Sequence, residues 1–271
     1  MMKTILVTGA TDGIGKQVAS QSAGLGHMVI VHGRNAKRVH ETMTEIKSKN
    51  PKARVESVVA DFEDLHNVDR MVGELESRGL KPDVLLNNAG LINFDRELLA
   101  NGLEKTFMVN YLSSFYLTRK LLPVLLKSNH PRIVNISSMA QSGSIDFNNL
   151  NGNKRFDGYE AYALSKLCNV LFTYKLHRLY QHSGLLAVCL HPGGINTKIL
   201  RKGWGIGGAS VEVGAERELF AAFSDEVLNF SGMYLVNNMP AKSAAISYDE
   251  HVQDRLWQIS SDLCGLSVKP E

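Results

Sequence analysis

Residues Thr8 to Gly15 read TGATDGIG, and they follow directly on the short apolar run TILV at Thr4 to Val7. The glycines Gly9, Gly13 and Gly15 have G-x-x-x-G-x-G spacing. Glycines so placed permit a tight turn and let backbone N–H groups approach a pyrophosphate at the N-terminus of the next helix. A glycine-rich turn between strand and helix can also be purely structural. Because a strand pattern precedes this one and a helical pattern begins at Ile14, nucleotide binding is the favoured interpretation.

Short apolar runs alternate with longer helical patterns along almost the whole chain. The runs expected to form strands are Thr4 to Val7, Met28 to Val31, Val55 to Val59, Val84 to Leu86, Ile133 to Ile136, Leu186 to Leu190 and Gly232 to Val236. The segments expected to form helices include Ala36 to Lys47, Leu65 to Arg78, Leu103 to Lys127 and Tyr162 to Tyr180. Short runs rich in Val, Ile and Leu are typical of strands buried on both faces of a parallel sheet. Their alternation with helices predicts an α/β fold, a single Rossmann domain over residues 1–271 with a doubly wound parallel sheet of about seven strands and helices on both faces.

Two segments, residues 141–158 and 198–209, show no regular pattern, and the second contains RKGWGIGG. Ligands of doubly wound sheets bind outside the carboxyl ends of the strands, where such loops lie. We therefore expect a substrate lid around residues 195–212.

Composition narrows the class of protein. The 271 residues carry 30 Lys and Arg against 27 Asp and Glu, and this balance gives no support to nucleic acid or an anionic membrane as the main partner. The three cysteines are far apart and have no C-x-x-C spacing, which fits a reducing, cytoplasmic location. No leader, membrane anchor or apolar run of ~18 residues is recognised, so we expect a soluble chain. The nine histidines lack metal-ligand spacing, and no metal site is predicted.

The second predicted strand indicates which dinucleotide is preferred. It ends in His32-Gly33-Arg34-Asn35, with no acid before Glu41 to bind a ribose 2′-hydroxyl. Arg34 can instead pair with a 2′-phosphate, and a charge-assisted bond of that kind contributes ~1.5 to 3 kcal/mol. NADP(H) is therefore preferred over NAD(H), although a solvated surface arginine is the alternative and Asp12 adds some unfavourable charge.

Seven sequence motifs, the glycine loop among them, appear in the order expected for one protein family, and together they carry a resemblance to it. They are the glycine loop, Asp61, NNAG at Asn87 to Gly90, Asn110, Ser138, Tyr162 with Lys166, and HPGGINT at His191 to Thr197. With these the chain resembles the classical short-chain dehydrogenase/reductase family over nearly its whole length. A lone Tyr/Lys pair at helical spacing is more often a packed aromatic under a snorkelling lysine, but the glycine loop and the serine make a catalytic pair the better interpretation.

The resemblance implies carbonyl–alcohol interconversion by hydride transfer, with Tyr162 as general acid/base. Lys166 lies one helical turn along the same face, and a cation ~4 Å from a forming phenolate can lower its pKa by up to ~3 units. Ser138 would hydrogen-bond the substrate carbonyl. Asn110 would hold a water in a proton relay that leads to Lys166.

The resemblance also implies the residues that bind the cofactor. Asp61 would accept a hydrogen bond from the adenine amino group, Asn87, Ala89 and Gly90 would border the adenosine ribose, and the segment from Pro192 would bind the nicotinamide carboxamide. The full set is Gly9, Thr11, Asp12, Gly13, Ile14, Gly15, Arg34, Asn35, Asp61, Phe62, Asn88, Ala89, Gly90, Tyr162, Lys166, Pro192, Gly193, Ile195 and Thr197.

A finer resemblance is to the retinol dehydrogenase-like branch. The 24 positions between Ser138 and Tyr162, the segment NNLNG and the stretch DRLWQISSDLCGL are similar to that branch. Ser138, Met139 and Trp204 are expected to contact substrate in a mainly apolar pocket, suited to a lipophilic aldehyde or ketone. Its expected walls are Met139, Ile195, Ile199, Trp204 and Ile206.

Two other functions are weighed against this one. A non-catalytic NADP(H)-binding regulator or scaffold would share the fold, but such proteins tend to lose the serine, tyrosine or lysine. A sugar-nucleotide epimerase or dehydratase shares the Tyr/Lys pair but usually has G-x-x-G-x-x-G spacing and a longer C-terminal substrate domain. A homodimer or homotetramer built on the long helices is a further expectation from the family.

Overall fold

The computed structural model of the chain describes residues 2–269. Within them the strands form one eight-stranded sheet with the order β3-β2-β1-β4-β5-β6-β7-β8. The strands are β1 (Thr4–Val7), β2 (Met28–Gly33), β3 (Val55–Val59), β4 (Val84–Asn87), β5 (Arg132–Ile136), β6 (Leu186–His191), β7 (Tyr234–Val236) and β8 (Met239–Ala241). Neighbouring strands run parallel, except that β8 is antiparallel to β7. The predicted doubly wound sheet is confirmed, with one additional strand.

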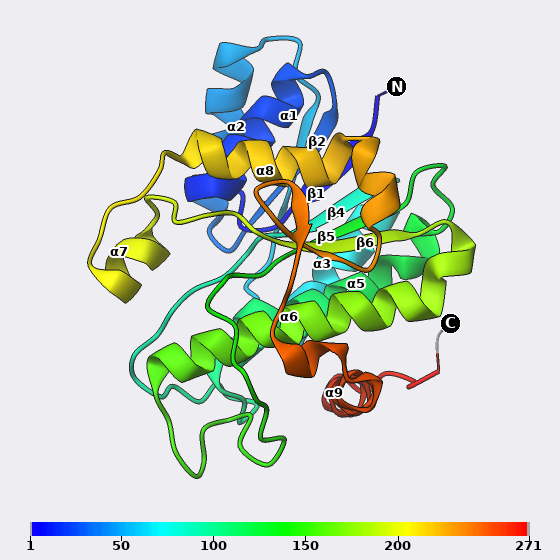
Figure 1. Cartoon of the computed structure of the whole chain (residues 1–271). Coiled ribbons are helices and arrows are strands. Elements are labelled where there is room, and N and C mark those ends of the chain that lie inside the picture. The colour runs from blue at the N-terminus through cyan, green and yellow to red at the C-terminus, as the bar shows by residue number, and fades with distance from the viewer. Residues whose placement is uncertain (1, 270–271) are drawn as a thin grey trace.

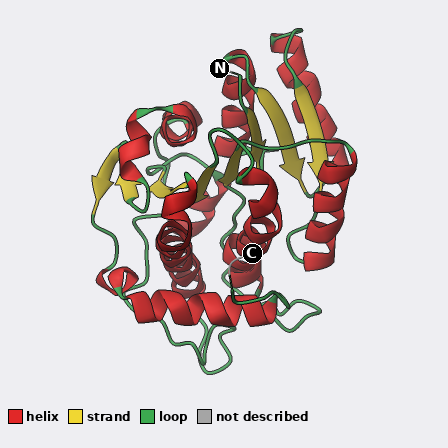
Figure 2. Ribbon diagram, turned by 90° about the vertical axis from the view of Figure 1, so that its right-hand side faces the viewer, coloured by secondary structure: helices red, strands yellow, loops and turns green. Residues whose placement is uncertain are grey.

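Helices cover both faces of the sheet (Figures 1 and 2). They are α1 (Gly13–Gly24), α2 (Ala36–Lys49), α3 (Leu65–Ser77), α4 (Lys105–Phe107), α5 (Ser113–Leu125), α6 (Gly158–Tyr180), α7 (Lys198–Trp204), α8 (Val211–Phe223) and α9 (Glu250–Leu263). The short helical turns are η1 (Met108–Leu112), η2 (Gln181–Ser183), η3 (Glu226–Phe230) and η4 (Ala245–Tyr248).

Two core clusters lie on opposite faces of the sheet. In β1, Ile5 and Val7 belong to the cluster shared with α1, α2 and α8, whereas Leu6 belongs to the cluster shared with α3, α5, α6 and α9. Successive side chains of a strand point to opposite faces, so a strand that is buried on both sides must be apolar throughout. This requirement explains why the central strands read as continuous apolar runs.

Side-chain caps fix the starts of several helices. Asp157 accepts a hydrogen bond from the backbone N–H of Glu160, and α6 therefore begins at Gly158, four residues before the predicted start at Tyr162. Asn35 caps α2 in the same way through the N–H of Arg38. The segment from Gly158 onward thus presents Tyr162 and Lys166 from the first three turns of a long, buried helix.

The helix expected over Leu103 to Lys127 is interrupted. Its middle turn, η1, is a π-helix that contains Asn110, with α4 before it and α5 after it. Single π-turns inside α-helices are frequent at functional sites, because the extra residue shifts the register of the side chains. The wider turn is not visible in a hydrophobic pattern of period 3.6.

The end of the sheet also differs from the sequence prediction. The strand expected over Gly232 to Val236 is shorter, and β8 follows it after a two-residue turn. Asn237 and Asn238 of that turn both have positive φ, 50° and 66°, as a tight type I′ hairpin requires. Asparagine tolerates this conformation better than most residues, so the Asn-Asn pair was the available signal for β8.

The segment that was expected to be an irregular lid contains α7. Thr197 caps this helix by accepting from the N–H of Leu200 at 3.3 Å. Two backbone hydrogen bonds join the ends of the lid. Ala209 N donates to Gly194 O at 2.9 Å, and Asn196 N donates to Ala209 O at 2.8 Å. Residues 194–209 therefore form a loop with joined ends beside the carboxyl edge of the sheet, where Figure 1 shows α7 on the left.

Helix α9 covers the outer side of the two long helices. The ring of Trp257 lies 5.3 Å from Phe115 of α5 and 6.1 Å from Phe172 of α6, and its Nε1 donates to Val268 O at 2.9 Å. Figure 1 shows α9 below α6, on the side away from the sheet. A homodimer that packed these parts of α5 and α6 together would have to displace α9.

Candidate active site

The glycine loop is held by the segment after β4. Thr8 Oγ1 accepts hydrogen bonds from the backbone N–H groups of Asn88 (2.9 Å) and Ala89 (3.0 Å), and the Asn88 side chain donates to Thr8 O at 2.8 Å. These contacts join two of the predicted cofactor segments at the carboxyl edge of β1 and β4. Thr8 was not among the predicted site residues, although it directly precedes the first glycine.

Two of the loop glycines are required by close packing. Gly9 has φ +67°, and a Cβ there would lie 2.9 Å from Ala89 Cα. A Cβ on Gly15 would lie 2.3 Å from Asn88 Nδ2 and 2.7 Å from Gly9 O. The loop can therefore lie against the NNAG segment only with glycine at these positions, and the first-turn N–H groups of α1 have no partner within the helix. This arrangement fits the pyrophosphate of a dinucleotide.

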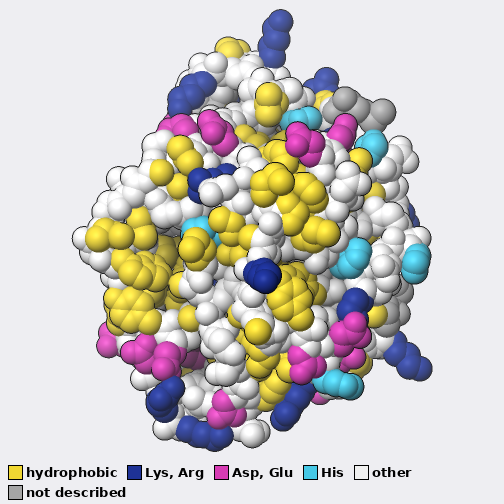
Figure 3. Space-filling model, in the orientation of Figure 1, with side chains coloured by type: hydrophobic (Ala, Val, Ile, Leu, Met, Phe, Trp, Pro, Cys, Tyr) yellow, Lys and Arg dark blue, Asp and Glu magenta, His cyan; other side chains and the backbone are white. Residues whose placement is uncertain are grey.

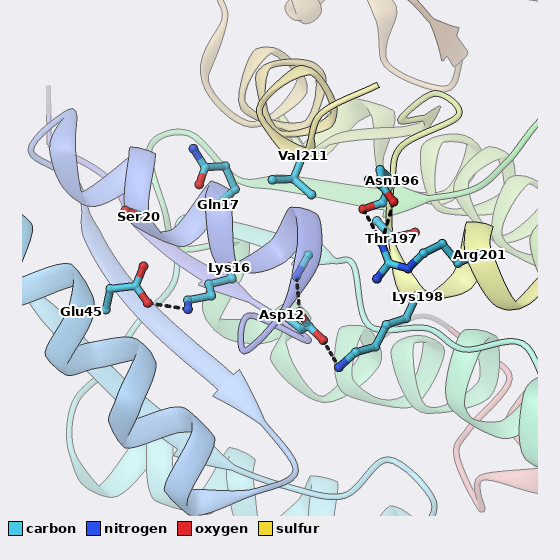
Figure 4. A pocket seen from close by; sticks show the side chains of 11 residues that line it. Asp12, Lys16, Gln17, Ser20, Glu45, Asn196, Thr197, Lys198, Arg201 and Val211 are labelled. Atoms are coloured by element: carbon cyan, nitrogen blue, oxygen red, sulfur yellow. Dashed lines mark hydrogen bonds and ion pairs between the residues drawn. The ribbon is translucent and has the colours of Figure 1, made fainter. Parts of the chain in front are cut away.

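Asp12 lies at the N-terminus of α1 between two basic residues. Its carboxylate accepts from Gly13 N at 2.9 Å and contacts Arg38 at 3.1 Å and Lys198 of the lid at 2.5 Å. Figure 4 shows the ion pair with Lys198 at the edge of a cavity of about 310 Å³ between α1 and the lid. The two cations hold the pKa of Asp12 below its usual value against the opposing effect of burial. Their positive charges also offset the negative charge of Asp12, which was expected to be unfavourable beside a bound phosphate.

The end of β2 carries the groups that face the adenosine side. Arg34 is exposed, and its Nη1 donates to Glu63 Oε1 at 3.1 Å. A guanidinium has five N–H donors, so this contact leaves capacity for a phosphate. Arg38 donates to Thr11 O at 3.0 Å and adds a second cation that the sequence analysis missed. Its spacing of four from Arg34 at the start of a predicted helix was the available signal.

Asp61 and Phe62 follow β3. Asp61 Oδ1 accepts from Glu63 N at 3.2 Å, and the ring of Phe62 is buried against His32. Ala60, which precedes them, donates its N–H to Gly33 O at the end of β2 at 3.3 Å, and the adenine contact of Asp61 stays a prediction.

Tyr162 and Ser138 come together from α6 and the end of β5. The Ser138 side chain lies close enough to the Tyr162 hydroxyl to lower its pKa, and both residues are buried. Trp204 of the lid covers the phenol edge-on, with 5.8 Å between ring centroids. The predicted serine and tyrosine therefore form one site under the lid.

The pKa of Tyr162 departs from the sequence prediction. Lys166 was expected to lower it, but burial of the phenol raises the pKa of Tyr162 to about 12, and the Ser138 side chain lowers it only in part. The Lys166 Nζ lies 5.4 Å from the centre of the tyrosine ring and donates to Ile136 O at 2.9 Å. Burial also lowers the pKa of Lys166 to about 8. The loss of solvation thus outweighs the effect of the Ser138 side chain, and the phenol is protonated at neutral pH.

Asn110 holds the Leu91 segment beside Lys166. Its amide accepts from Leu91 N at 2.8 Å and donates to Leu91 O at 2.8 Å and to Ser165 Oγ at 3.0 Å. Its backbone carbonyl accepts from Asn169 Nδ2 at 3.2 Å. The side chain is thus committed to protein groups, and the water relay through Asn110 stays a prediction.

The HPGGINT segment leaves β6 and enters the lid. Arg217 of α8 supports it by donating to Pro192 O at 2.7 Å, and Thr197 lies against Gly13 of the glycine loop. Ile195 is 2% exposed and packs in the core cluster under α8. It was expected to wall the substrate pocket, and this expectation is wrong because the side chain points into the core at the base of the lid.

Asn87 also lies elsewhere than expected. Its side chain donates to Thr118 Oγ1 at 3.0 Å and to Asn135 Oδ1 at 2.8 Å, inside the sheet and α5. It therefore belongs to a buried polar network and not to the border of an adenosine ribose. Gly90, by contrast, faces the site, since a Cβ there would lie 3.7 Å from Lys166 Nζ.

The mouth of the site is apolar. Met139 is 69% exposed, Ile206 56% and Trp204 40%, while Ile199 is half-buried. Tyr159 lies between Trp204 and Phe94, with ring centroids 5.8 Å and 5.1 Å away. Figure 3 shows hydrophobic side chains gathered on the left of the molecule, where α7 and the start of α6 lie. Such a cluster of exposed apolar side chains suits an apolar ligand.

Glu218 of α8 is a buried acid near the site. It has no exposed surface, and no hydrogen-bond partner for either carboxylate oxygen is found among the residues that the structure describes. Burial raises the pKa of Glu218 to about 8, against the smaller opposing effect of the Lys166 charge. The group is therefore mainly a neutral acid at pH 7.

We expect replacement of Glu218 by glutamine to remove a pH dependence of stability. The unfolded chain releases the Glu218 proton near its ordinary pKa, whereas the folded chain retains it up to about pH 8. Wild-type stability should therefore fall between about pH 5 and about pH 8 relative to Glu218→Gln. Thermal unfolding midpoints of both proteins across this range measure the difference. The exposed neighbour Glu216→Gln is the control, and parallel curves for wild type and Glu218→Gln would contradict a buried acid.

The described residues hold no group of three or more His, Cys, Asp or Glu side chains placed to bind a metal ion. In the same part of the chain, no helix is both long and apolar enough to span a membrane.

Comparison with known proteins identifies the family. The profile of the short chain dehydrogenases matches residues 3–204. Human retinol dehydrogenase 13 is 33% identical over 284 residues, which cover 98% of this chain and 86% of that protein. Human polyprenol dehydrogenase is 31% identical over 283 residues, covering 97% and 86%. A short chain dehydrogenase of Shigella flexneri 2a in complex with NADP superposes with a TM-score of 0.68 at 25% identity, covering 86% of this chain and 95% of that one.

The chain belongs to the short chain dehydrogenase family. Within that family it is similar over nearly its full length to the retinol dehydrogenases, as the sequence resemblance implied. It is therefore an oxidoreductase for a carbonyl and alcohol pair that uses a nicotinamide cofactor, and the glycine loop fits that cofactor in its geometry.

Proposed function

We propose that the protein is an NADP(H)-dependent oxidoreductase that interconverts a lipophilic aldehyde or ketone with its alcohol, with Tyr162 as the general acid/base. The contact between Tyr162 and Ser138 beneath the lid, with Lys166 beside them, carries the proposal. This arrangement brings the Tyr162 phenol, the Ser138 hydroxyl and the Lys166 ammonium group together at the carboxyl edge of the sheet, next to the glycine loop.

Each residue of the site has its own role in carbonyl reduction. Ser138 binds the carbonyl oxygen, and Tyr162 donates its proton to that oxygen as negative charge develops there. A bound nicotinamide dinucleotide supplies the hydride that the carbonyl carbon receives. A phenol with a pKa of about 12 stays protonated at neutral pH, which suits proton donation. Lys166 is held by Ile136 O and places its charge beside the phenolate that remains.

The proposed preference for NADP(H) rests on two cations, Arg34 just after β2 and Arg38 in the first turn of α2. Arg34 and Arg38 lie on the side of the loop where the adenosine is expected. Arg34 is paired with Glu63 and Arg38 with Asp12, and each guanidinium still has N–H donors that can bind a phosphate. The NADP in the Shigella flexneri relative supports this proposal.

We expect Arg34→Glu to weaken NADPH binding by about tenfold to a hundredfold, because a charge-assisted bond to the 2′-phosphate is lost. NADH lacks that phosphate, so its dissociation constant should change by less than about threefold. Fluorescence titration of both dinucleotides measures the effect. Arg255→Glu makes the same change of charge on α9, far from the loop, and should leave both constants unaltered. Equal losses for NADPH and NADH in Arg34→Glu would remove the argument.

The proposed substrate class rests on exposed apolar side chains near the site, since Met139 follows Ser138 in the chain, Trp204 contacts the Tyr162 ring, and Ile206 follows in the lid. The two human relatives are named for retinol and polyprenol, which supports a lipophilic substrate. Steady-state oxidation of NADPH against a panel of hydrophobic and small polar carbonyls tests the proposal. Preference for small charged sugars would contradict it.

We also propose a reducing, cytoplasmic location. All three cysteines are free thiols, and Cys168 and Cys189 are buried.

A further inference from the structure

We propose that His32 is a positioning residue for the dinucleotide, whose imidazole ties the glycine loop to the segment on the adenosine side. His32 is the penultimate residue of β2 and is 3% exposed. It does not touch Tyr162, Ser138 or Lys166 through any described hydrogen bond, so its role is separate from the proton transfer.

The imidazole contacts one backbone group on each side. Its Nδ1 accepts from Gly9 N at 3.3 Å, and its Nε2 lies 3.0 Å from Ala60 O. The ring stacks on Phe62 with 4.4 Å between centroids and 22° between planes. Gly9 belongs to the glycine loop, while Ala60 and Phe62 flank Asp61. A single side chain thus links two cofactor segments that come from different strands.

The contacts define the tautomer of the ring. Ala60 O can only accept, so Nε2 must carry the proton, and Nδ1 is then the acceptor for the Gly9 N–H. Burial holds the pKa of His32 down at about 4, with smaller opposing effects from Ala60 O and Asp61, so the ring is neutral at physiological pH. Both backbone groups are therefore satisfied by the neutral form.

The position of Gly9 determines where the loop can bind phosphate. The loop is already packed against Ala89 with no room for a Cβ, so a shift of Gly9 would move the following turn and the start of α1. Without the imidazole, the half-buried Gly9 N and the buried Ala60 O would lose these partners, and only backbone bonds such as Ala10 N to His32 O (2.8 Å) and Ala60 N to Gly33 O (3.3 Å) would still join the two segments to β2.

A second histidine of the same strand region provides a matched control. His27, at the amino end of β2, accepts from Lys3 N through Nδ1 at 3.2 Å and stacks on Phe223 with 4.1 Å between centroids. It makes the same two kinds of contact but lies at the opposite end of the sheet from the loop. His27 is half-buried, so the variant separates loss of a stacked, hydrogen-bonded histidine from loss of loop position.

The test compares His32→Leu, His32→Asn and His27→Leu by fluorescence titration with NADPH and NADH, and by kcat and KM. His32→Leu should weaken both dinucleotides alike by about tenfold, as expected for a buried donor left without its acceptor. His32→Asn places an amide oxygen near the position of Nδ1 and should recover affinity to within about threefold of wild type. At saturating cofactor, kcat should change little.

Wild-type dissociation constants in His32→Leu would overturn the proposal. Equal losses in His32→Leu and His32→Asn would also overturn it, because ring shape and not the acceptor would then matter. If His32→Leu fails to fold, His32→Asn and His32→Gln decide the question, since only the asparagine variant keeps the acceptor toward Gly9. The proposal rests on dinucleotide binding and not on NADP preference, so its failure is distinguishable from failure of the Arg34 prediction.

Discussion

Replacing Tyr162 by phenylalanine is expected to lower kcat/KM for carbonyl reduction by about 10²- to 10⁴-fold, the usual contribution of a positioned general acid. Phenylalanine keeps the ring that Trp204 covers but removes the hydroxyl that Ser138 contacts. NADPH affinity should therefore stay within a few-fold of wild type. Initial rates with a hydrophobic aldehyde and a separate NADPH titration measure the two quantities.

Tyr159→Phe is the matched control for this prediction. Tyr159 lies three residues earlier on α6, contacts the same Trp204 at the same 5.8 Å, and donates its hydroxyl to Gly203 O. It should retain most of the wild-type rate. If Tyr162→Phe matched wild type with every carbonyl of the panel, the acid would be wrongly assigned and a non-catalytic dinucleotide-binding protein would be favoured.

The second large effect concerns the fold. We expect Trp257→Ala to reduce the free energy of unfolding by about 3 to 5 kcal/mol, as for other buried aromatic residues cut back to alanine. The indole is 3% exposed, lies between Phe115 and Phe172, and has the Arg119 guanidinium 4.7 Å from its ring centre. Its removal leaves a cavity between α9 and the two long helices.

Urea unfolding followed by circular dichroism measures this loss. Leu263→Ala, on the same helix but 41% exposed, should cost less than about 1 kcal/mol. A loss below about 1 kcal/mol for Trp257→Ala would show that α9 is not part of the cooperative core. In that case the faces of α5 and α6 would be available for a dimer.

Most of the sheet could be predicted from local pattern. Each buried parallel strand must be apolar on both faces, and the runs at Thr4 to Val7 and Val55 to Val59 match their strands in full. The strand–helix alternation also predicted a doubly wound sheet through right-handed βαβ connections, whereas the order of the strands was not predicted. The short strand β8 and the helices after residue 197 lacked such patterns, because each is specified by a turn, a cap or packing against a distant helix.

The site was predicted by residue type more successfully than by environment. Ser138, Tyr162 and Lys166 meet at one place, but the pKa of Tyr162 is raised and not lowered, since burial depends on how the lid packs. Ile195 and Asn87 match the family motif in sequence, yet their side chains point into the core and into the sheet.

Residues missed by the sequence analysis act through long-range contacts. Thr8, His32 and Arg38 connect segments that are up to 81 positions apart. The position of Thr8 before the glycine loop and the spacing of Arg38 from Arg34 were the only signals in the sequence, because the contacts themselves depend on how distant segments pack.

Isotope transfer from the cofactor to the substrate tests the central claim most directly. NADPH carrying deuterium at one or the other transferable position of its dihydronicotinamide ring is incubated with the wild-type protein and a lipophilic aldehyde, and the product is examined by mass spectrometry. We expect one labelled form, and not the other, to deliver its deuterium to the carbon that bears the new hydroxyl. Alcohol that contains no deuterium from either form, or no alcohol from any carbonyl of the panel, would contradict hydride transfer at this site.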